Sequence, residues 1–247
     1  MSENALFRFY AELNDFLSPQ RRFTSFPHAL ARPASVKDVI EALGVPHPEV
    51  GLILLNSAFV DFSHVVRGGD RVSVYPEFRT LSPLSLLRAP LNEIRFLLDA
   101  HLGRLATYLR MLGFDCSYMT DCADKQLAQI SHDEERILLT RDCGLLKRSA
   151  VVYGYYVRAT EPKQQVVEVV KRFNLSGKAS PFTRCLTCNA LLRGVPKESV
   201  LERLEPRTRQ YYAEFQSCPE CNRVYWAGSH YEHMQAFVKS ILAESWR

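Results

Sequence analysis

The sequence predicts an α/β protein of three parts: a small mixed sheet with one helix at residues 1–80, a parallel-sheet α/β domain at 92–175 and a zinc-binding module at 181–240. Three observations lead to this prediction. The first part contains short apolar runs on both sides of one helical pattern. The second alternates strand-like and helix-like patterns. The third carries two C-x-x-C pairs.

The composition supports a globular chain. Hydrophobic residues make up 47% of the 247 residues and charged residues 23%, which excludes a disordered protein. No apolar run reaches the roughly 18–20 residues of a membrane helix. The start of the chain, with Glu3 and Glu12, lacks the basic segment of a secretory signal. We therefore expect a soluble, cytoplasmic protein with no membrane partner.

The positive charge lies in the later parts of the chain. Residues 1–80 carry 8 Lys and Arg against 9 Asp and Glu, whereas residues 176–247 carry 10 against 7, or +3. This distribution is compatible with a polyanionic partner.

The N-terminal part reads as two strands, one helix and three more strands. Residues 6–13 and 21–26 predict a hairpin with its turn at 15–20, and Ser35 with Asp38 predicts a capping box that opens a helix ending at Gly44. The last three strands are expected at 51–56, 57–60 and 71–76, with a Gly68-Gly69-Asp70 turn before the last. The order ββαβββ is that of a β-grasp domain.

The central part predicts a parallel sheet. Strands are expected at 95–98, 114–119, 136–140 and 151–157, and helices at 101–112, 125–131 and 162–173. Leu102, Leu105, Leu109 and Leu112 form one helical stripe, and Gly113 stands where a helix often ends. Nearly uninterrupted apolar strands that alternate with helices are typical of three-layer α/β domains.

Carboxylates follow the strands of this sheet. Asp99 and Asp142 stand at the carboxyl ends of two apolar strands, and Asp124, with Asp121 before it, lies in a strand-to-helix loop. Ligands of open parallel sheets bind outside those ends. Converging carboxylates suit one or two Mg²⁺ or Mn²⁺ ions. The alternative is that Asp99, Asp124 and Asp142 cap the helices or turns that follow them.

The four paired cysteines predict a zinc site. Cys185, Cys188, Cys218 and Cys221 form two C-x-x-C pairs, while Cys116, Cys122 and Cys143 are scattered. Two such pairs complete a tetrahedral all-thiolate shell for Zn²⁺. Two disulfides are the alternative, which a chain without a secretory signal disfavours.

Aromatic and basic residues are mixed around the second cysteine pair. The aromatic set is Tyr211, Tyr212, Phe215, Tyr225 and Trp226, and the arginines are Arg203, Arg207, Arg209 and Arg223. Such a mixture can stack bases and hold phosphates, or the aromatics can form the core of a small module. His230 and His233 would share a helical face, either toward the carboxylates or on the surface.

The central and C-terminal motifs resemble a known nuclease family. RFLLDAHLGRLATYLRMLGFD, RILLTRD, the two cysteine knuckles and YWAGSH are similar to the Mut-seven C-terminal RNase family, over residues 93–234. This resemblance implies a PIN-like nuclease domain with a C-terminal zinc ribbon and an acidic site of Asp99, Asp124 and Asp142, with Asp121 as a further candidate. PIN nucleases commonly carry a fourth acidic residue, which this sequence does not place.

The N-terminal part resembles the ubiquitin-like sulfur carriers related to ThiS and MoaD, on the basis of Asn56 and the GGDRVSVYP stretch. Those carriers end in a Gly-Gly tail that is adenylated and thiocarboxylated. Here Gly68-Gly69 precedes a strand and the chain continues past Phe78. The sequence therefore predicts a module that docks a protein partner or is purely structural, without carrier chemistry.

Together these observations predict a metal-dependent ribonuclease that hydrolyses RNA, with structural Zn and catalytic Mg or Mn. The residues expected to contact substrate are Arg104, Arg141, Lys147 and His230, since cations can meet phosphate oxygens. The alternative function is a non-catalytic RNA-binding or protein-interaction adaptor that keeps the zinc ribbon.

Overall fold

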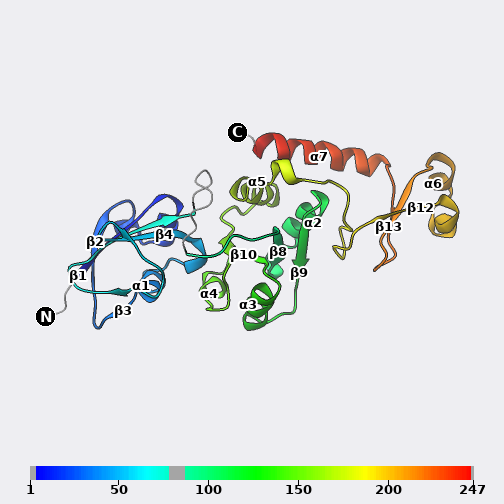
Figure 1. Cartoon of the computed structure of the whole chain (residues 1–247). Coiled ribbons are helices and arrows are strands. Elements are labelled where there is room, and N and C mark those ends of the chain that lie inside the picture. The colour runs from blue at the N-terminus through cyan, green and yellow to red at the C-terminus, as the bar shows by residue number, and fades with distance from the viewer. Residues whose placement is uncertain (1–3, 78–86, 246–247) are drawn as a thin grey trace. The chain divides into compact units, whose positions relative to one another are not determined.

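A computed structural model describes residues 4–77 and 87–245 of the chain (Figure 1). The chain divides into two compact units that interleave along the sequence. The first contains Met1–Glu93 and Cys122–Tyr156, and the second contains Ile94–Asp121 and Val157–Arg247. The predicted domain end at residue 80 lies outside the described residues, and the division into 1–80, 92–175 and 181–240 stays a prediction.

The N-terminal part of the first unit is a mixed sheet with one helix, as predicted. Its strand order is β2-β1-β7-β4-β5, with β1 and β7 parallel and the other neighbours antiparallel. The elements are β1 (Asn4–Phe9), β2 (Ser25–Ala29), α1 (Val36–Ala42), β4 (Val50–Leu55), β5 (Ala58–Phe59) and β7 (Arg71–Pro76), with a second small sheet of β3 (Ala34–Ser35) and β6 (Val65–Val66). This is the β-grasp arrangement that the element order predicted.

Buried residues alternate with more exposed ones along the strands, and the apolar residues of α1 lie on one face, so that together they form one hydrophobic core. Phe7, Ile53 and Val74 face inward from β1, β4 and β7, and Ile40 closes the core from α1. The Ser35 hydroxyl accepts a hydrogen bond from the Asp38 N–H at 3.1 Å, so α1 starts at the predicted cap.

The connection between β1 and β2 differs from the predicted hairpin. It folds into two 3₁₀ helices, η1 (Ala11–Phe16) and η2 (Pro19–Arg21), and β2 begins at Ser25 instead of residue 21. Leu13 and Leu17 of this connection are buried in the core. The prediction of a hairpin turn at 15–20 was therefore wrong, because apolar residues inside the connection stabilise a compact loop instead.

Asn14 explains the shape of that loop. Its buried amide donates to the carbonyl oxygens of Phe9 and Ala11, at 3.0 and 2.9 Å, and its Oδ1 accepts from the Phe23 N–H at 2.6 Å. One side chain thus replaces the ladder hydrogen bonds that a longer hairpin would have made.

The rest of the first unit, residues 122–156, contains half of the segment in which strands and helices were predicted to alternate. It contains α3 (Asp124–Asp133), β10 (Ile137–Thr140), α4 (Cys143–Leu146) and β11 (Gly154–Tyr156), with β10 and β11 parallel. The 3₁₀ helix η3 (His47–Glu49) of the N-terminal part contacts β11. The N-terminal module and residues 122–156 therefore pack together.

The second unit begins with the other half of the alternating segment. Its elements are β8 (Arg95–Leu98), the 3₁₀ helix η4 (Ala100–Leu102), α2 (Gly103–Met111), β9 (Asp115–Tyr118) and α5 (Pro162–Arg172). β8 and β9 are parallel, as are β10 and β11 of the first unit, which confirms the predicted parallel arrangement. The leucine stripe of α2 is buried, also as predicted.

A small antiparallel sheet follows in the second unit. The strands of this sheet are β12 (Arg193–Val195), β13 (Phe215–Ser217) and β14 (Val224–Tyr225). The helices of the same segment are η5 (Ser176–Lys178), η6 (Lys197–Arg203), α6 (Pro206–Tyr211) and α7 (Ser229–Ser245). The sheet order is β12-β13-β14. Figure 1 shows α7 running back alongside α5, where Lys163 and Glu244 form an ion pair at 2.6 Å.

Gly113 marks the point where this module meets α2. Its φ is +92°, and a Cβ at this position would lie 2.1 Å from the Ser180 carbonyl oxygen. Glycine is therefore required both by the backbone conformation and by the close approach of the following chain.

Among the described helices, none combines the length and the hydrophobicity that crossing a bilayer requires.

Candidate functional site

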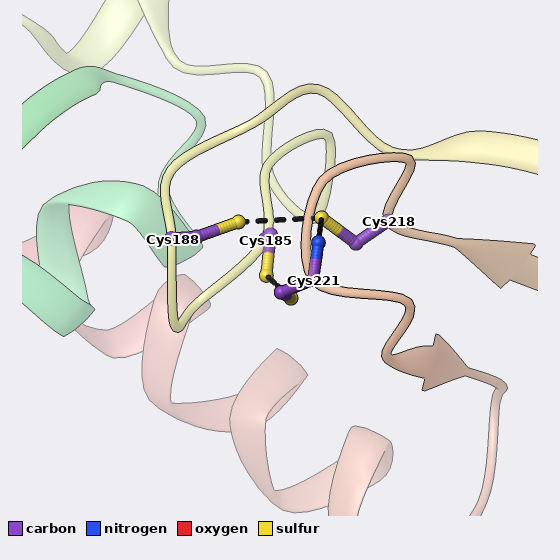
Figure 2. A group of neighbouring side chains, drawn as sticks. All are labelled: Cys185, Cys188, Cys218 and Cys221. Atoms are coloured by element: carbon purple, nitrogen blue, oxygen red, sulfur yellow. Dashed lines mark hydrogen bonds between the residues drawn. The ribbon is translucent and has the colours of Figure 1, made fainter.

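Four cysteine side chains of the second unit point toward one common centre (Figure 2). The sulfur atoms of Cys185, Cys188, Cys218 and Cys221 all lie within 4.8 Å of one another. Cys185 and Cys221 are 3.5 Å apart, and Cys188 and Cys218 are 3.3 Å apart. A disulfide needs about 2.05 Å, whereas a zinc ion with four sulfurs at about 2.3 Å separates them by about 3.8 Å. The cluster is compatible with a structural zinc and not with two disulfides.

Each C-x-x-C segment forms a tight turn, or knuckle, and the two knuckles have the same backbone conformation. In each, the residue after the second cysteine is an asparagine with positive φ, 74° for Asn189 and 59° for Asn222. Its N–H donates at 3.0 Å to the carbonyl of the first cysteine, Cys185 or Cys218. Asparagine tolerates this left-handed conformation better than other residues with a Cβ. The repeated pattern C-x-x-C-N carried this signal in the sequence.

A tyrosine supports the first knuckle. The Tyr225 oxygen accepts from the Leu186 N–H at 3.2 Å and lies 3.1 Å from the Cys185 sulfur. Burial by itself raises the pKa of the Cys185 thiol, but hydrogen bonds from Tyr225 and from nearby backbone N–H groups outweigh it and lower the pKa to about 6. Burial raises the pKa of the Cys188 thiol to about 12. The surroundings thus favour the thiolate form at Cys185, and a bound metal ion would favour it at all four cysteines.

The first knuckle is also fastened to the α2–β9 segment. Arg110 donates from its guanidinium to the carbonyls of Leu186 and Thr187, at 3.2 and 2.8 Å, and to that of Cys116 at 2.9 Å. The Asn189 amide accepts from the Cys116 N–H and donates to Asp115, both at 3.0 Å. These hydrogen bonds fix the cysteine cluster to the α2–β9 segment.

Two of the aspartates predicted to hold a metal ion follow strands and cap the helical turns after them. Asp99 follows β8, is 6% exposed and accepts from the His101 N–H at 3.0 Å through Oδ1. Asp142 follows β10, and its Oδ1 accepts from the N–H groups of Gly144 and Leu145 at 2.6 and 3.2 Å. The capping interpretation is confirmed for both residues.

Asp124 behaves differently. It is the first residue of α3, whose cap is Ala123, so the capping interpretation was wrong here. Its Oδ2 lies 3.5 Å from the Arg148 guanidinium, and both side chains are partly exposed. Asp121 accepts from the Thr120 hydroxyl at 3.1 Å. Asp124 and Asp142 belong to the first unit, and Asp99 and Asp121 to the second.

Comparison with known families gives two matches. The Mut7-C RNAse domain matches residues 94–238, more than half of the chain, and the Mut7-C ubiquitin domain matches residues 2–82. The chain belongs to the Mut7-C RNAse domain family. The resemblance read from the sequence motifs is thereby confirmed, including its N-terminal ubiquitin-like domain. Nothing matches among the curated proteins or among the solved structures.

The residues expected to contact substrate are dispersed over the Mut7-C RNAse domain. Arg104 is exposed in the first turn of α2, and His230 is exposed in the first turn of α7. Arg141 follows β10 directly and is partly buried. Lys147, at the end of α4, donates from Nζ to the Glu41 carbonyl at 2.8 Å. This last contact ties the nuclease domain to α1 of the ubiquitin-like domain.

The aromatic residues of the zinc module divide into two groups. Phe215 is buried with Val200 and Leu204, as the core interpretation expected. Trp226 and Tyr211 keep 38% and 71% of their surface exposed. Some aromatics of the Mut7-C RNAse domain are therefore structural, and others are accessible to a ligand.

Proposed function

We propose that this protein is a metal-dependent ribonuclease that hydrolyses RNA phosphodiester bonds. The observation that carries the proposal is the match of more than half of the chain to an RNase domain family, together with Asp99 and Asp142, each of which follows a strand of the domain. We assign the divalent ion, Mg²⁺ or Mn²⁺, to Asp99, Asp124 and Asp142, because these ions prefer carboxylate oxygens.

The chemistry of the donors fits such an ion. Asp142 uses Oδ1 for both capping hydrogen bonds, and its Oδ2 makes none within the described part of the chain. The cap fixes the direction of the carboxylate while the second oxygen stays available. A bound ion would supply an activated water for attack on phosphorus.

The cationic side chains would hold the RNA backbone. We assign Arg104, Arg141, Lys147 and His230 to phosphate contacts, since charge-assisted hydrogen bonds to phosphate are strong. Lys147 has to leave the Glu41 carbonyl in order to reach a phosphate. The ubiquitin-like domain, which provides that carbonyl, is proposed to dock a protein partner. A cytoplasmic location is part of the proposal, because the four paired cysteines are arranged for a metal ion and not for disulfides.

The test is Asp142→Asn in the full chain. Asparagine caps helices about as well as aspartate, so the substitution keeps α4 but removes the charge. We expect loss of Mg²⁺- or Mn²⁺-dependent cleavage of single-stranded RNA, with the thermal midpoint within about 2 °C of wild type.

Asp133→Asn, an exposed aspartate at the end of α3, is the matched control and should cleave normally. If wild-type protein binds RNA but cleaves none with any of these ions, the protein is an RNA-binding adaptor. If Asp142→Asn cleaves RNA at the wild-type rate, Asp142 only caps α4 and does not contribute to a catalytic metal site.

A further inference from the structure

The zinc module contains a cavity of about 710 Å³ that none of the metal or acidic sites uses. It lies against the β12-β13-β14 sheet and is also lined by residues from the start of the module and from α7. The residues that carry the argument are Phe182, Gly194, Lys197, Gln216, Trp226 and Tyr231. Its volume is within the range of small-ligand sites.

A glycine keeps the floor of this cavity open. Gly194, Gln216 and Tyr225 are direct cross-strand partners, so they stand in one row across the sheet, and all three line the cavity. A Cβ on Gly194 would meet no atom within 4 Å. Any larger side chain at Gly194 would therefore extend into space that is now empty.

The walls are aromatic and partly accessible. The rings of Phe182 and Tyr231 are 4.6 Å apart, and Trp226, which is 38% exposed, lies near Phe215. Phe182 has a φ of +63°, uncommon for a bulky residue, and its N–H donates to the Met111 carbonyl at 3.0 Å. The contact with α2 thus holds an aromatic ring in the wall in a conformation that the residue alone would avoid.

Polar groups complete the site. Within the described chain, the Lys197 ammonium forms no ion pair or hydrogen bond, whereas the Arg184 guanidinium is already bound to Gly113, Asn189 and Asp115. Gln216 offers both a donor and an acceptor from the floor. The C-terminal segment 176–247, which contains the module, carries a net charge of +3, from 10 basic and 7 acidic residues.

We propose that this cavity binds a nucleobase of single-stranded RNA, stacked on the aromatic wall, with Lys197 on an adjoining phosphate. A flat base needs aromatic faces and an amide that reads its edge, and its backbone needs a free cation. The inference rests on the proposed function, because it assigns to the zinc module the task of holding the RNA that the acidic residues cleave.

The experiment measures binding of a short, unstructured, fluorescein-labelled RNA to the full, zinc-loaded chain by anisotropy, without added Mg²⁺ or Mn²⁺. Gly194→Leu places a branched side chain on the floor of the cavity and should weaken binding about tenfold. Gly177→Leu is the matched control, since a Cβ there also meets nothing and the residue lies outside the cavity. It should bind like wild type.

Trp226→Ala is the second variant, and zinc content reports that each module is folded. Wild-type affinity in both Gly194→Leu and Trp226→Ala, or equal weakening in Gly177→Leu, overturns the cavity proposal and leaves the nuclease proposal intact. Cavity-dependent binding by a chain that never cleaves RNA supports the cavity and refutes the nuclease.

Discussion

Single polar side chains connect turns that lie far apart in the sequence. Asn56, with a φ of +51°, accepts from the Arg71 N–H at 2.9 Å and donates to Asp70 at 2.8 Å. It therefore ties the β4–β5 turn to the turn that contains Gly69, whose φ is +87°. The internal Gly-Gly pair forms a turn before β7, and the absence of carrier chemistry stays a prediction.

The two knuckle asparagines allow a prediction at the same scale. Asn189→Gly keeps the left-handed conformation but removes two side-chain hydrogen bonds, one from the Cys116 N–H and one to Asp115. We expect a loss of about 1–3 kcal/mol in the free energy of unfolding. Urea denaturation of the zinc-loaded chain measures it.

Asn222→Gly is the matched control, because Asn222 occupies the same position in the second knuckle and its side chain makes no hydrogen bond in the described chain. Its stability should stay within about 0.5 kcal/mol of wild type. Equal losses in the two variants would show that the side-chain contacts of Asn189 contribute nothing.

At the scale of elements, the zinc module is too small to be stable by burial alone. Its strands are two or three residues long, and its core is Val200, Leu204 and Phe215. Modules of this size need a metal or a disulfide, and the sulfur separations exclude the disulfide. The four cysteines therefore determine whether β12, β13 and β14 form at all.

Removal of zinc tests this dependence. We expect one tightly bound Zn²⁺ per chain by elemental analysis, and we expect strong chelation or Cys185→Ser to unfold residues 181–228, because metal binding is part of folding there. Hydrogen exchange should rise in that range and stay low in β10 and β11. A metal-free chain with wild-type protection at 181–228 would contradict the prediction.

At the scale of the whole molecule, the ubiquitin-like domain is packed against residues 122–156 of the nuclease domain. The Arg88 guanidinium donates to the carbonyls of Pro48 and Val50 on one side and of Val152 on the other. His47 is buried and bonds both to Glu41 and to the Val151 carbonyl, at 2.6 and 2.8 Å. These contacts make the N-terminal domain part of the first unit.

Arg88→Met should weaken that packing. The substitution keeps much of the apolar stem but leaves three carbonyl groups without this donor, so we expect a loss of about 2–4 kcal/mol. Thermal unfolding measures the loss, and hydrogen exchange should increase at 151–156. Arg67→Met, an exposed arginine in the same domain, should leave both measurements unchanged. If Arg88→Met also leaves them unchanged, the two parts are not coupled through this residue.

The sequence by itself determined the main elements of the N-terminal and central parts, the parallel strands, the four-cysteine cluster and the family. Each of these depends on short-range patterns, such as the leucine spacing in α2 or the two C-x-x-C pairs, and such a pattern is visible because its residues lie close together in the sequence. The tertiary structure decided the rest. The loop at 11–21 follows from the buried bonds of Asn14.

Contacts between distant segments account for the remaining features. Asn189 meets Asp115 across 74 residues, and Lys147 meets Glu41 across 106. The cavity over Gly194 arises because three strands, the start of the module and α7 come together around a position without a side chain. No local periodicity encodes such a contact, since its energy depends on which surfaces the folded chain brings together.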